Sequence, residues 1–180
     1  MNDNSMHGTT IIAVRTDKGT AIGGDGQVSL GNIIMKAGAK KIRRIADGKV
    51  FVGFAGGTAD AFALLERFEG KLKSTQGSTL RAAVALAKEW RTDRVLQRLN
   101  AFLVITDPDT LVVLSGNGDV VEPDDGIATI GSGSGYALAA ARALISAGFT
   151  DPADIVRRSL EIASDICVFT NKNFTIEVVK

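Results

Sequence analysis

The fold of this chain depends on one stretch near its start, Met6-His7-Gly8-Thr9-Thr10-Ile11-Ile12-Ala13-Val14-Arg15. A short polar leader ends in glycine, two threonines follow, and the apolar, β-branched run after them predicts a buried strand. We interpret residues 1–8 as a leader that is removed by cleavage between Gly8 and Thr9. The hydroxyl and the new α-amine of Thr9 would then act together as a catalyst, and residues 9–180 would form a single domain.

Histidine usage restricts the chemistry that such a domain can perform. The only histidine is His7, inside the leader, so a chain that starts at Thr9 contains none. Ser-His and Cys-His catalysis within one subunit are then excluded, and so are zinc sites with histidine ligands. A hydrolase built from this chain needs another base. The α-amine, with an unperturbed pKa of about 7.7–8.0, can accept a proton near neutral pH.

The composition is ordinary for a globular protein. Of the 180 residues, 45% are hydrophobic and 23% are charged, and the net charge of +1 suggests neither a nucleic-acid nor a membrane partner. The single cysteine, Cys167, excludes an intrachain disulfide. No apolar run reaches the roughly 18 residues of a membrane span, and the leader has no hydrophobic segment typical of a secretory signal. We therefore expect a cytoplasmic protein.

Strand and helix patterns follow one another in blocks. Strands are predicted at 10–15, 20–24, 40–45, 50–55, 102–106, 111–115, 120–122, 127–130 and 174–179, and helices at 58–68, 79–99, 136–147 and 152–168. A glycine-containing loop is predicted after residue 27, running to 33–35. Thr58 and the pair Asp151-Pro152 are typical helix starts. Because the strands come in hairpins and the helices in pairs, the order predicts an α+β sandwich. Each helix pair would cover the outer face of one of two stacked, mostly antiparallel sheets.

The glycine-rich run Gly131-Ser132-Gly133-Ser134-Gly135 precedes a predicted helix and has three interpretations. It could hold a phosphate at the helix N-terminus, although Tyr136 breaks the G-x-G-x-x-G pattern and no G-x-x-x-x-G-K-[ST] occurs. It could be a strand-to-helix turn that lets another backbone approach closely. It could also direct Ser132 at the amine of Thr9.

Asp25 and Lys41 lie 16 and 32 residues after Thr9. Isolated charged residues are usually surface residues, but Asp25 lies among glycines and Lys41 begins a predicted strand. Buried together, they would form an ion pair under the first strand, next to Thr9. A lysine ammonium there would favour deprotonation of the Thr9 hydroxyl and stabilise a developing negative charge.

The whole chain from Thr9 onward resembles the HslV-type proteolytic subunits of bacterial ATP-dependent proteases, and more distantly proteasome β subunits. The resemblance rests on several blocks in order: Thr-Thr-Ile-Ile-Ala-Val-Arg (9–15), Gly-Asp-Gly-Gln (24–27), Leu-Gly-Asn (30–32), Gly-Phe-Ala-Gly-Gly-Thr-Ala-Asp-Ala-Phe (53–62), Trp-Arg-Thr-Asp-Arg (90–94), Gly-Asn-Gly-Asp-Val-Val (116–121), Asp-Ile-Cys (165–167) and Thr170-Asn171.

This resemblance implies a threonine peptidase of the N-terminal nucleophile class, with a four-layer α-β-β-α sandwich. Thr9 would be the nucleophile, Asp25, Lys41 and Ser132 its supporting polar residues, and Gly56 the backbone N–H donor to the oxyanion. Two stacked hexameric rings, a homo-dodecamer, would enclose a chamber. An HslU-type hexameric ATPase would use the ATP, unfold protein substrates and deliver them, so this chain needs no organic cofactor.

The resemblance also implies a sodium ion bound by the backbone carbonyls of Ser164, Cys167 and Thr170. The first of these positions is commonly glycine in the family, and a backbone ligand tolerates the serine found here. The leader differs as well, because many family members lose only the initiator Met whereas eight residues precede Thr9 here. Translation could instead start at Met6.

Two other function classes are weighed against the peptidase. A non-catalytic shell subunit would be expected to have lost Thr9, Asp25, Lys41 or Ser132, and all four are present. A nucleotide-binding module would need a phosphate-binding loop, and no segment fits one. Loss of residues 1–8 from the purified protein would favour the peptidase.

Overall fold

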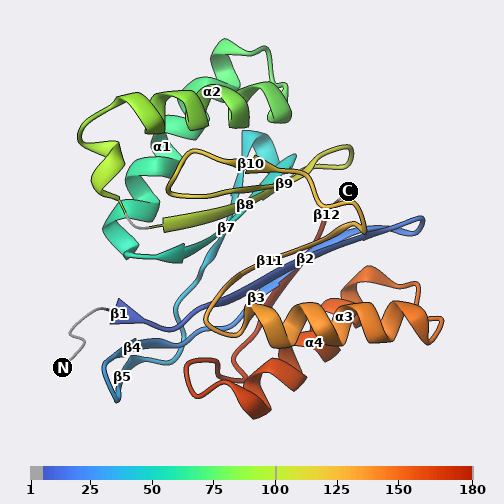
Figure 1. Cartoon of the computed structure of the whole chain (residues 1–180). Helices are drawn as coiled ribbons and strands as arrows, with labels where there is room; N and C mark the ends of the chain where they lie inside the picture. The colour runs from blue at the N-terminus through green and yellow to red at the C-terminus, as the bar shows by residue number, and fades with distance from the viewer. Residues whose placement is uncertain (1–5, 100, 180) are drawn as a thin grey trace.

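Four layers stack in the computed structural model of this chain, which describes residues 6–99 and 101–179 without the side chains of 6, 7, 58 and 59 (Figure 1). Helices α1 (Thr58–Ser74) and α2 (Thr79–Thr92) form one outer layer. Helices α3 (Ser134–Ser146) and α4 (Pro152–Ile166) form the other. Two antiparallel sheets lie between them, so the predicted α+β, four-layer α-β-β-α sandwich is confirmed.

The strands belong to three sheets. The five-stranded sheet has the order β10-β9-β8-β7-β6, the four-stranded sheet β11-β2-β3-β12, and a small third sheet β1-β4-β5. Their bounds are β1 Met6–His7, β2 Thr10–Thr16, β3 Gly19–Gly24, β4 Val28–Leu30, β5 Ile33–Lys36, β6 Ile42–Ile45, β7 Val50–Gly56, β8 Ala101–Thr106, β9 Leu111–Leu114, β10 Val120–Val121, β11 Ile127–Gly131 and β12 Thr175–Val179. No helix of the described ranges is long and apolar enough to span a membrane.

Strand β2 is central because both of its faces are buried. Ile11 and Ala13 face the other sheet, in a cluster that includes Phe51, whereas Ile12 and Val14 pack against α3 and α4. This follows from the alternation of side chains along a strand. Full burial of one such isoleucine contributes roughly 1.5–3 kcal/mol. Burial of the apolar run at 10–15 therefore fixes the position of Thr9, which directly precedes β2, within the sandwich.

The structure differs from the sequence predictions in two helices and one sheet. The helix predicted at 79–99 ends at Thr92, because the Asp93 carboxylate accepts the N–H groups of Val95 and Leu96 and starts a separate 3₁₀ turn at Leu96–Arg98. Helix α1 is capped at Gly57 and continues to Ser74, beyond the predicted end. Thr58 was expected to cap this helix, but the helix begins at Thr58 itself and Gly57 is the N-cap residue.

The small sheet is the feature that sequence analysis missed. Residues 28–30 were predicted as part of a loop, but they form β4, which pairs with β5 on one side and with leader strand β1 on the other. In β1, Met6 lies opposite Leu30 and His7 opposite Ser29. Residues 1–5 of the predicted leader lie outside the described residues. Residues 6–7 of the predicted leader, close to Thr9, therefore pair with β4 as an additional strand of this small sheet.

Candidate active site

Thr9 lies between leader strand β1 and strand β2, and only 8% of its surface is exposed. The backbone N–H of Ser132 donates to the Thr9 carbonyl at 2.8 Å. Gly131, at the end of β11, has φ +95°, and a Cβ there would lie 2.1 Å from the Thr9 carbonyl oxygen. Only glycine allows this approach. The glycine-rich run is therefore the close-approach turn of the second interpretation.

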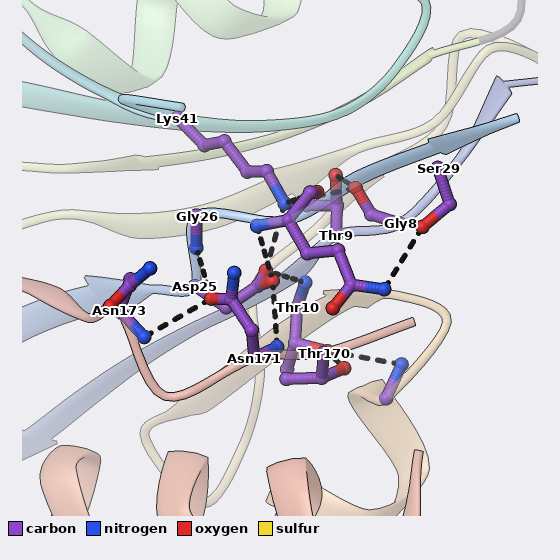
Figure 2. Close-up of polar contacts among 12 residues, drawn as sticks. Gly8, Thr9, Thr10, Asp25, Gly26, Ser29, Lys41, Thr170, Asn171 and Asn173 are labelled. Atoms are coloured by element: carbon purple, nitrogen blue, oxygen red, sulfur yellow. Dashed lines mark hydrogen bonds and ion pairs between the residues drawn. The ribbon is translucent and has the colours of Figure 1, made fainter. Parts of the chain in front are cut away.

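Lys41 and Asp25 form a buried ion pair beside Thr9 (Figure 2). The Lys41 ammonium donates to Asp25 Oδ1 at 2.9 Å and to the Gln27 carbonyl at 2.5 Å. The side chains of Lys41 and Asp25 are 4% and 0% exposed, respectively. The Asp25 carboxylate also accepts three backbone N–H groups, from Thr10 and Gln27 at 2.8 Å and from Asn171 at 3.3 Å. A buried charge is tolerated when it is paired and hydrogen-bonded in this way.

Burial lowers the pKa of Lys41 below its usual value. The neighbouring Asp25 carboxylate opposes this shift by favouring the charged form, but desolvation is the larger effect. The Lys41 ammonium therefore gives up its proton more readily than a lysine in water. Such a group supplies a compact positive charge while it is protonated, and it loses that charge at a lower pH than a lysine in water.

The third acceptor of the Lys41 ammonium is the Gly8 carbonyl, at 2.9 Å. The same carbonyl oxygen accepts a very short hydrogen bond from the Thr9 hydroxyl. The bond between Gly8 and Thr9 thus has a hydroxyl on one side and a cation on its oxygen, as Figure 2 shows. Gly8 has φ +117°, and a Cβ on it would lie 3.0 Å from the Gln27 carbonyl oxygen. A side chain at this position is strained as well as crowded.

A cavity of about 940 Å³ opens next to Thr9. Its lining includes Gly8, Thr9, Lys41, Gly56, Gly57 and Ser132. Gly56 ends β7 and Gly57 caps α1, so the first turn of that helix borders the cavity. Unpaired N–H groups and the positive end of the helix dipole favour negative charge at such a place. The cavity can accommodate a peptide beside Thr9.

The structure brings most of the predicted catalytic residues together. Asp25 and Lys41 are in direct contact, and Lys41 reaches the carbonyl that precedes Thr9. The hydrogen bond that joins Ser132 to Thr9 uses the backbone N–H of Ser132, and Ser132 is otherwise exposed at the cavity. Gly56 lines the same cavity.

Sequence analysis missed several groups around this site. Thr10, Gln27 and Asn171 were not singled out as site residues, although the backbone N–H of each holds the Asp25 carboxylate. The hydroxyl of Thr10 lies 2.7 Å from that of Thr170 and accepts the N–H of Gly133 at 3.1 Å. The only sequence signals were their places within quoted blocks: Thr10 in Thr-Thr-Ile-Ile-Ala-Val-Arg, Gln27 in Gly-Asp-Gly-Gln and Asn171 in Thr-Asn.

The three residues of the expected sodium site lie where α4 ends. Ser164 belongs to the last turn of α4, Cys167 follows the helix with ψ 114°, and Thr170 is buried beyond it. Within the described residues, the Cys167 carbonyl accepts the N–H of Thr170 at 3.0 Å, and no backbone N–H donates to the carbonyls of Ser164 or Thr170. Carbonyl oxygens left over at a helix end need other partners, so these residues fit an oxygen-coordinated cation.

Comparisons with known proteins identify the family of this chain. The family model described as "Proteasome subunit" matches residues 5–179. This chain belongs to the proteasome family. Eukaryotic HslV from Trypanosoma brucei is 46% identical, with a TM-score of 0.91 over 95% of this chain and 99% of that one. The chain is therefore an HslV-type proteasome-like subunit, and this membership supports a threonine peptidase.

More distant structures share the fold of this HslV-type subunit. Thiobacillus denitrificans BPH is 21% identical, and its complex with epoxomicin is 22% identical. Both have a TM-score of 0.75 over 95% of this chain, and they are covered to 97% and 98% of their own lengths. At this identity they support the sandwich architecture alone.

Proposed function

We propose that this chain is a threonine-type endopeptidase whose nucleophile is the hydroxyl of Thr9, released as the N-terminus by self-cleavage after Gly8. One observation carries the proposal: the Thr9 hydroxyl and the Lys41 ammonium both contact the carbonyl oxygen of Gly8. The first is the nucleophile of the bond to be cut. The second is a positive charge on the oxygen that becomes negative during the attack.

The Thr9 hydroxyl and the Lys41 ammonium both act in self-cleavage. Thr9 Oγ bonds to the Gly8 carbonyl carbon, and the Lys41 ammonium stabilises the oxyanion that forms. The bond to the Thr9 nitrogen then breaks, and the proton lost by the hydroxyl ends on that nitrogen. The product is an ester of residues 1–8 on Thr9 Oγ, which water hydrolyses. This leaves a free hydroxyl and a free α-amine on Thr9.

Peptide hydrolysis repeats this chemistry on a substrate in the cavity. The α-amine takes the hydroxyl proton as general base, and Oγ attacks the substrate carbonyl. Lys41, held by Asp25, supplies positive charge beside Oγ, and the N–H of Gly56 donates to the oxyanion. Ser132 lies near the new α-amine and supports it as a polar neighbour. The peptide C–N bond then breaks, and the protonated α-amine returns its proton to the leaving amine. Water finally hydrolyses the ester on Oγ, which releases the acyl group as an acid and restores the hydroxyl.

The assembly follows the HslV resemblance. We propose a homo-dodecamer of two stacked hexameric rings in the cytoplasm, with the Thr9 sites facing an inner chamber. An HslU-type hexameric ATPase would unfold proteins and deliver them with its own ATP. This proposal makes the chain the proteolytic part of an ATP-dependent degradation machine. It includes neither a nucleic-acid nor a membrane partner.

A sodium ion is part of the proposal. The backbone carbonyls of Ser164, Cys167 and Thr170 would hold it, since carbonyl oxygens are available at this helix end. The ion would supply a fixed positive charge that orders the loop after α4. All bond making and breaking would stay with Thr9 and its neighbours.

Mass spectrometry of the purified protein tests the proposed function. The expected mature chain starts at Thr9 and hydrolyses fluorogenic peptides. Gly8→Ala should slow leader loss by about 10-fold or more, because a Cβ at φ +117° meets the Gln27 carbonyl and displaces the bond. Cleavage of added peptides by any mature Gly8→Ala chain should be normal. An active wild-type protein with its leader intact would refute the mechanism, because a blocked amine cannot be the base.

A second prediction concerns pH. The kcat for a fluorogenic peptide should rise as the Thr9 α-amine loses its proton, whose ordinary pKa is about 8. It should fall again as Lys41 loses its proton. Because burial lowers the pKa of Lys41, this fall should come at a pH below the ordinary lysine value of about 10.4. Light scattering at each pH checks that the assembly is intact. An unchanged kcat up to pH 10.5 would contradict this role.

A further inference from the structure

Three separate segments meet around the Lys41–Asp25 pair. The Asp25 turn comprises residues 25–27, the Lys41 segment comprises residues 37–41 between β5 and β6, and the C-terminal loop comprises residues 167–173 after α4. None of them contains a helix or strand. One backbone hydrogen bond joins two of them, from the N–H of Ala39 to the Gly26 carbonyl at 2.9 Å, and side chains provide the other links.

Asn171 is one side chain that bonds to all three segments, and Figure 2 shows its contacts with Gly26 and Asn173. Its Oδ1 accepts the N–H of Gly26 at 3.1 Å, in the Asp25 turn, and the N–H of Asn173 at 3.1 Å, within its own loop. Its Nδ2 donates to the Ala37 carbonyl at 2.8 Å, at the start of the Lys41 segment. Its backbone N–H donates to the Asp25 carboxylate. The side-chain amide of Asn171 thus accepts hydrogen bonds through its oxygen and donates one through its nitrogen.

Asn173 provides an internal comparison. Its Nδ2 donates to the same Ala37 carbonyl, at 2.9 Å. Its side chain makes no hydrogen bond to the Asp25 turn among the described residues. The two asparagines therefore share the contact with the Lys41 segment, and they differ in the contact with Gly26. A comparison of Asn171 with Asn173 variants therefore isolates the effect of the contact with Gly26, which lies in the Asp25 turn.

We propose that Asn171 is a positioning residue that sets the placement of the Lys41 ammonium relative to Asp25 and the bond to be cut. The inference rests on the proposed function, since it needs the Thr9 chemistry. Asn171 does not touch the reacting atoms and acts through the two segments that carry the pair. The tight fit at Gly26 supports this role, because a Cβ there would lie 2.4 Å from the Ala37 carbonyl oxygen. The turn and the segment touch, and the Asn171 amide adds a second link to the backbone hydrogen bond between Ala39 and Gly26.

The expected effect is on rate and not on substrate binding. Asn171 does not line the cavity beside Thr9, so the KM for a peptide should stay within about twofold. Its loss lets the Asp25 turn and the Lys41 segment shift relative to each other. Displacements of about 1 Å cost up to about 10²-fold in rate when reacting groups must be aligned. We expect Asn171→Ala to lower kcat about 10-fold. The same variant should slow leader loss by a similar factor, since self-cleavage needs no added substrate.

The experiment compares full-length wild type, Asn171→Ala and Asn173→Ala, each freshly purified. A mass-spectrometric time course gives the rate of leader loss, peptide hydrolysis gives kcat and KM, and light scattering and thermal melting give assembly and stability. Asn171→Ser is a fourth variant, because a serine hydroxyl can still accept the N–H two residues on but is too short to reach Ala37. It supplies the test if the alanine variant does not fold.

A drop in both rates for Asn171→Ala, or for Asn171→Ser in its place, with Asn173→Ala near wild type and KM unchanged, supports the positioning role. Equal losses in the Asn171 and Asn173 variants would overturn it, because the shared Ala37 contact would explain them. A lower melting temperature with normal kcat per assembled ring would also overturn it. Failure of the wild-type protein to lose its leader or hydrolyse peptides is a different result, and it would refute the proposed function itself.

Discussion

Thr9→Ala is expected to yield a folded, assembled protein that keeps its leader and does not cut peptides. The Thr9 hydroxyl donates to the Gly8 carbonyl oxygen, and its removal takes away the nucleophile that would bond to the carbon of that carbonyl. Without self-cleavage the α-amine also stays blocked in a peptide bond. Loss of nucleophile and base together should lower peptide hydrolysis by roughly 10³-fold or more. Intact-mass measurement and fluorogenic peptide turnover check both parts.

Two control variants make this result specific. Thr9→Ser keeps a hydroxyl at the same place, so it should still lose the leader and turn over peptide. Thr16→Ala removes a half-buried threonine from the other end of β2, where its hydroxyl donates to the Thr150 carbonyl. It should behave as wild type. Cleavage after Gly8 in the Thr9→Ala protein would show that another protease removes the leader, and retained peptide hydrolysis would exclude Thr9 as nucleophile.

Much of the sandwich could be predicted because its signals are local. The apolar run at 10–15 alternates between two hydrophobic clusters, and hairpin and helix-pair patterns order the remaining layers. Strand β4 and leader strand β1 carried no such signal. They are short and partly polar, and their pairing depends on the leader lying beside residues 28–30 in space. The end of α2 at Thr92 depended on one carboxylate that the apolar spacing did not reveal.

The site could be predicted only where residue type itself suggested the chemistry. The threonine after glycine, the absence of histidine beyond residue 7, and a lysine and an aspartate at suggestive spacings pointed to Thr9, Lys41 and Asp25. Asn171 could not be found in this way. It reaches Gly26 and Ala37 across 145 and 134 residues of sequence, and an asparagine in a loop is most often a turn residue. Its significance comes from the segments that it joins.

Lys41→Ala should separate catalysis from folding. The ammonium contacts the Gly8 carbonyl, the Asp25 carboxylate and the Gln27 carbonyl, so its loss removes positive charge from the place where negative charge develops. Removal of one electrostatic stabiliser of this kind costs about 10²-fold or more in rate. We expect that loss in peptide hydrolysis, and a matching loss in leader cleavage. Lys18→Ala, in the exposed turn between β2 and β3, is the matched lysine control and should leave both rates unchanged.

The stability of the Lys41→Ala variant decides whether its loss of activity reflects catalysis or folding. Asp25 would lose its cation, but it keeps three backbone N–H donors, so unfolding should become easier by about 3 kcal/mol, the low end for a broken buried ion pair, and the rings should still assemble. Lys41→Arg should not restore activity, because a planar guanidinium does not replace a compact ammonium in a space with three fixed acceptors. If Lys41 only anchored its segment through Asp25, the alanine variant would melt earlier while turnover per assembled ring stayed near wild type. Ring assembly, melting temperature and turnover measured on one Lys41→Ala preparation distinguish the two roles, and near-normal turnover would remove Lys41 from the mechanism.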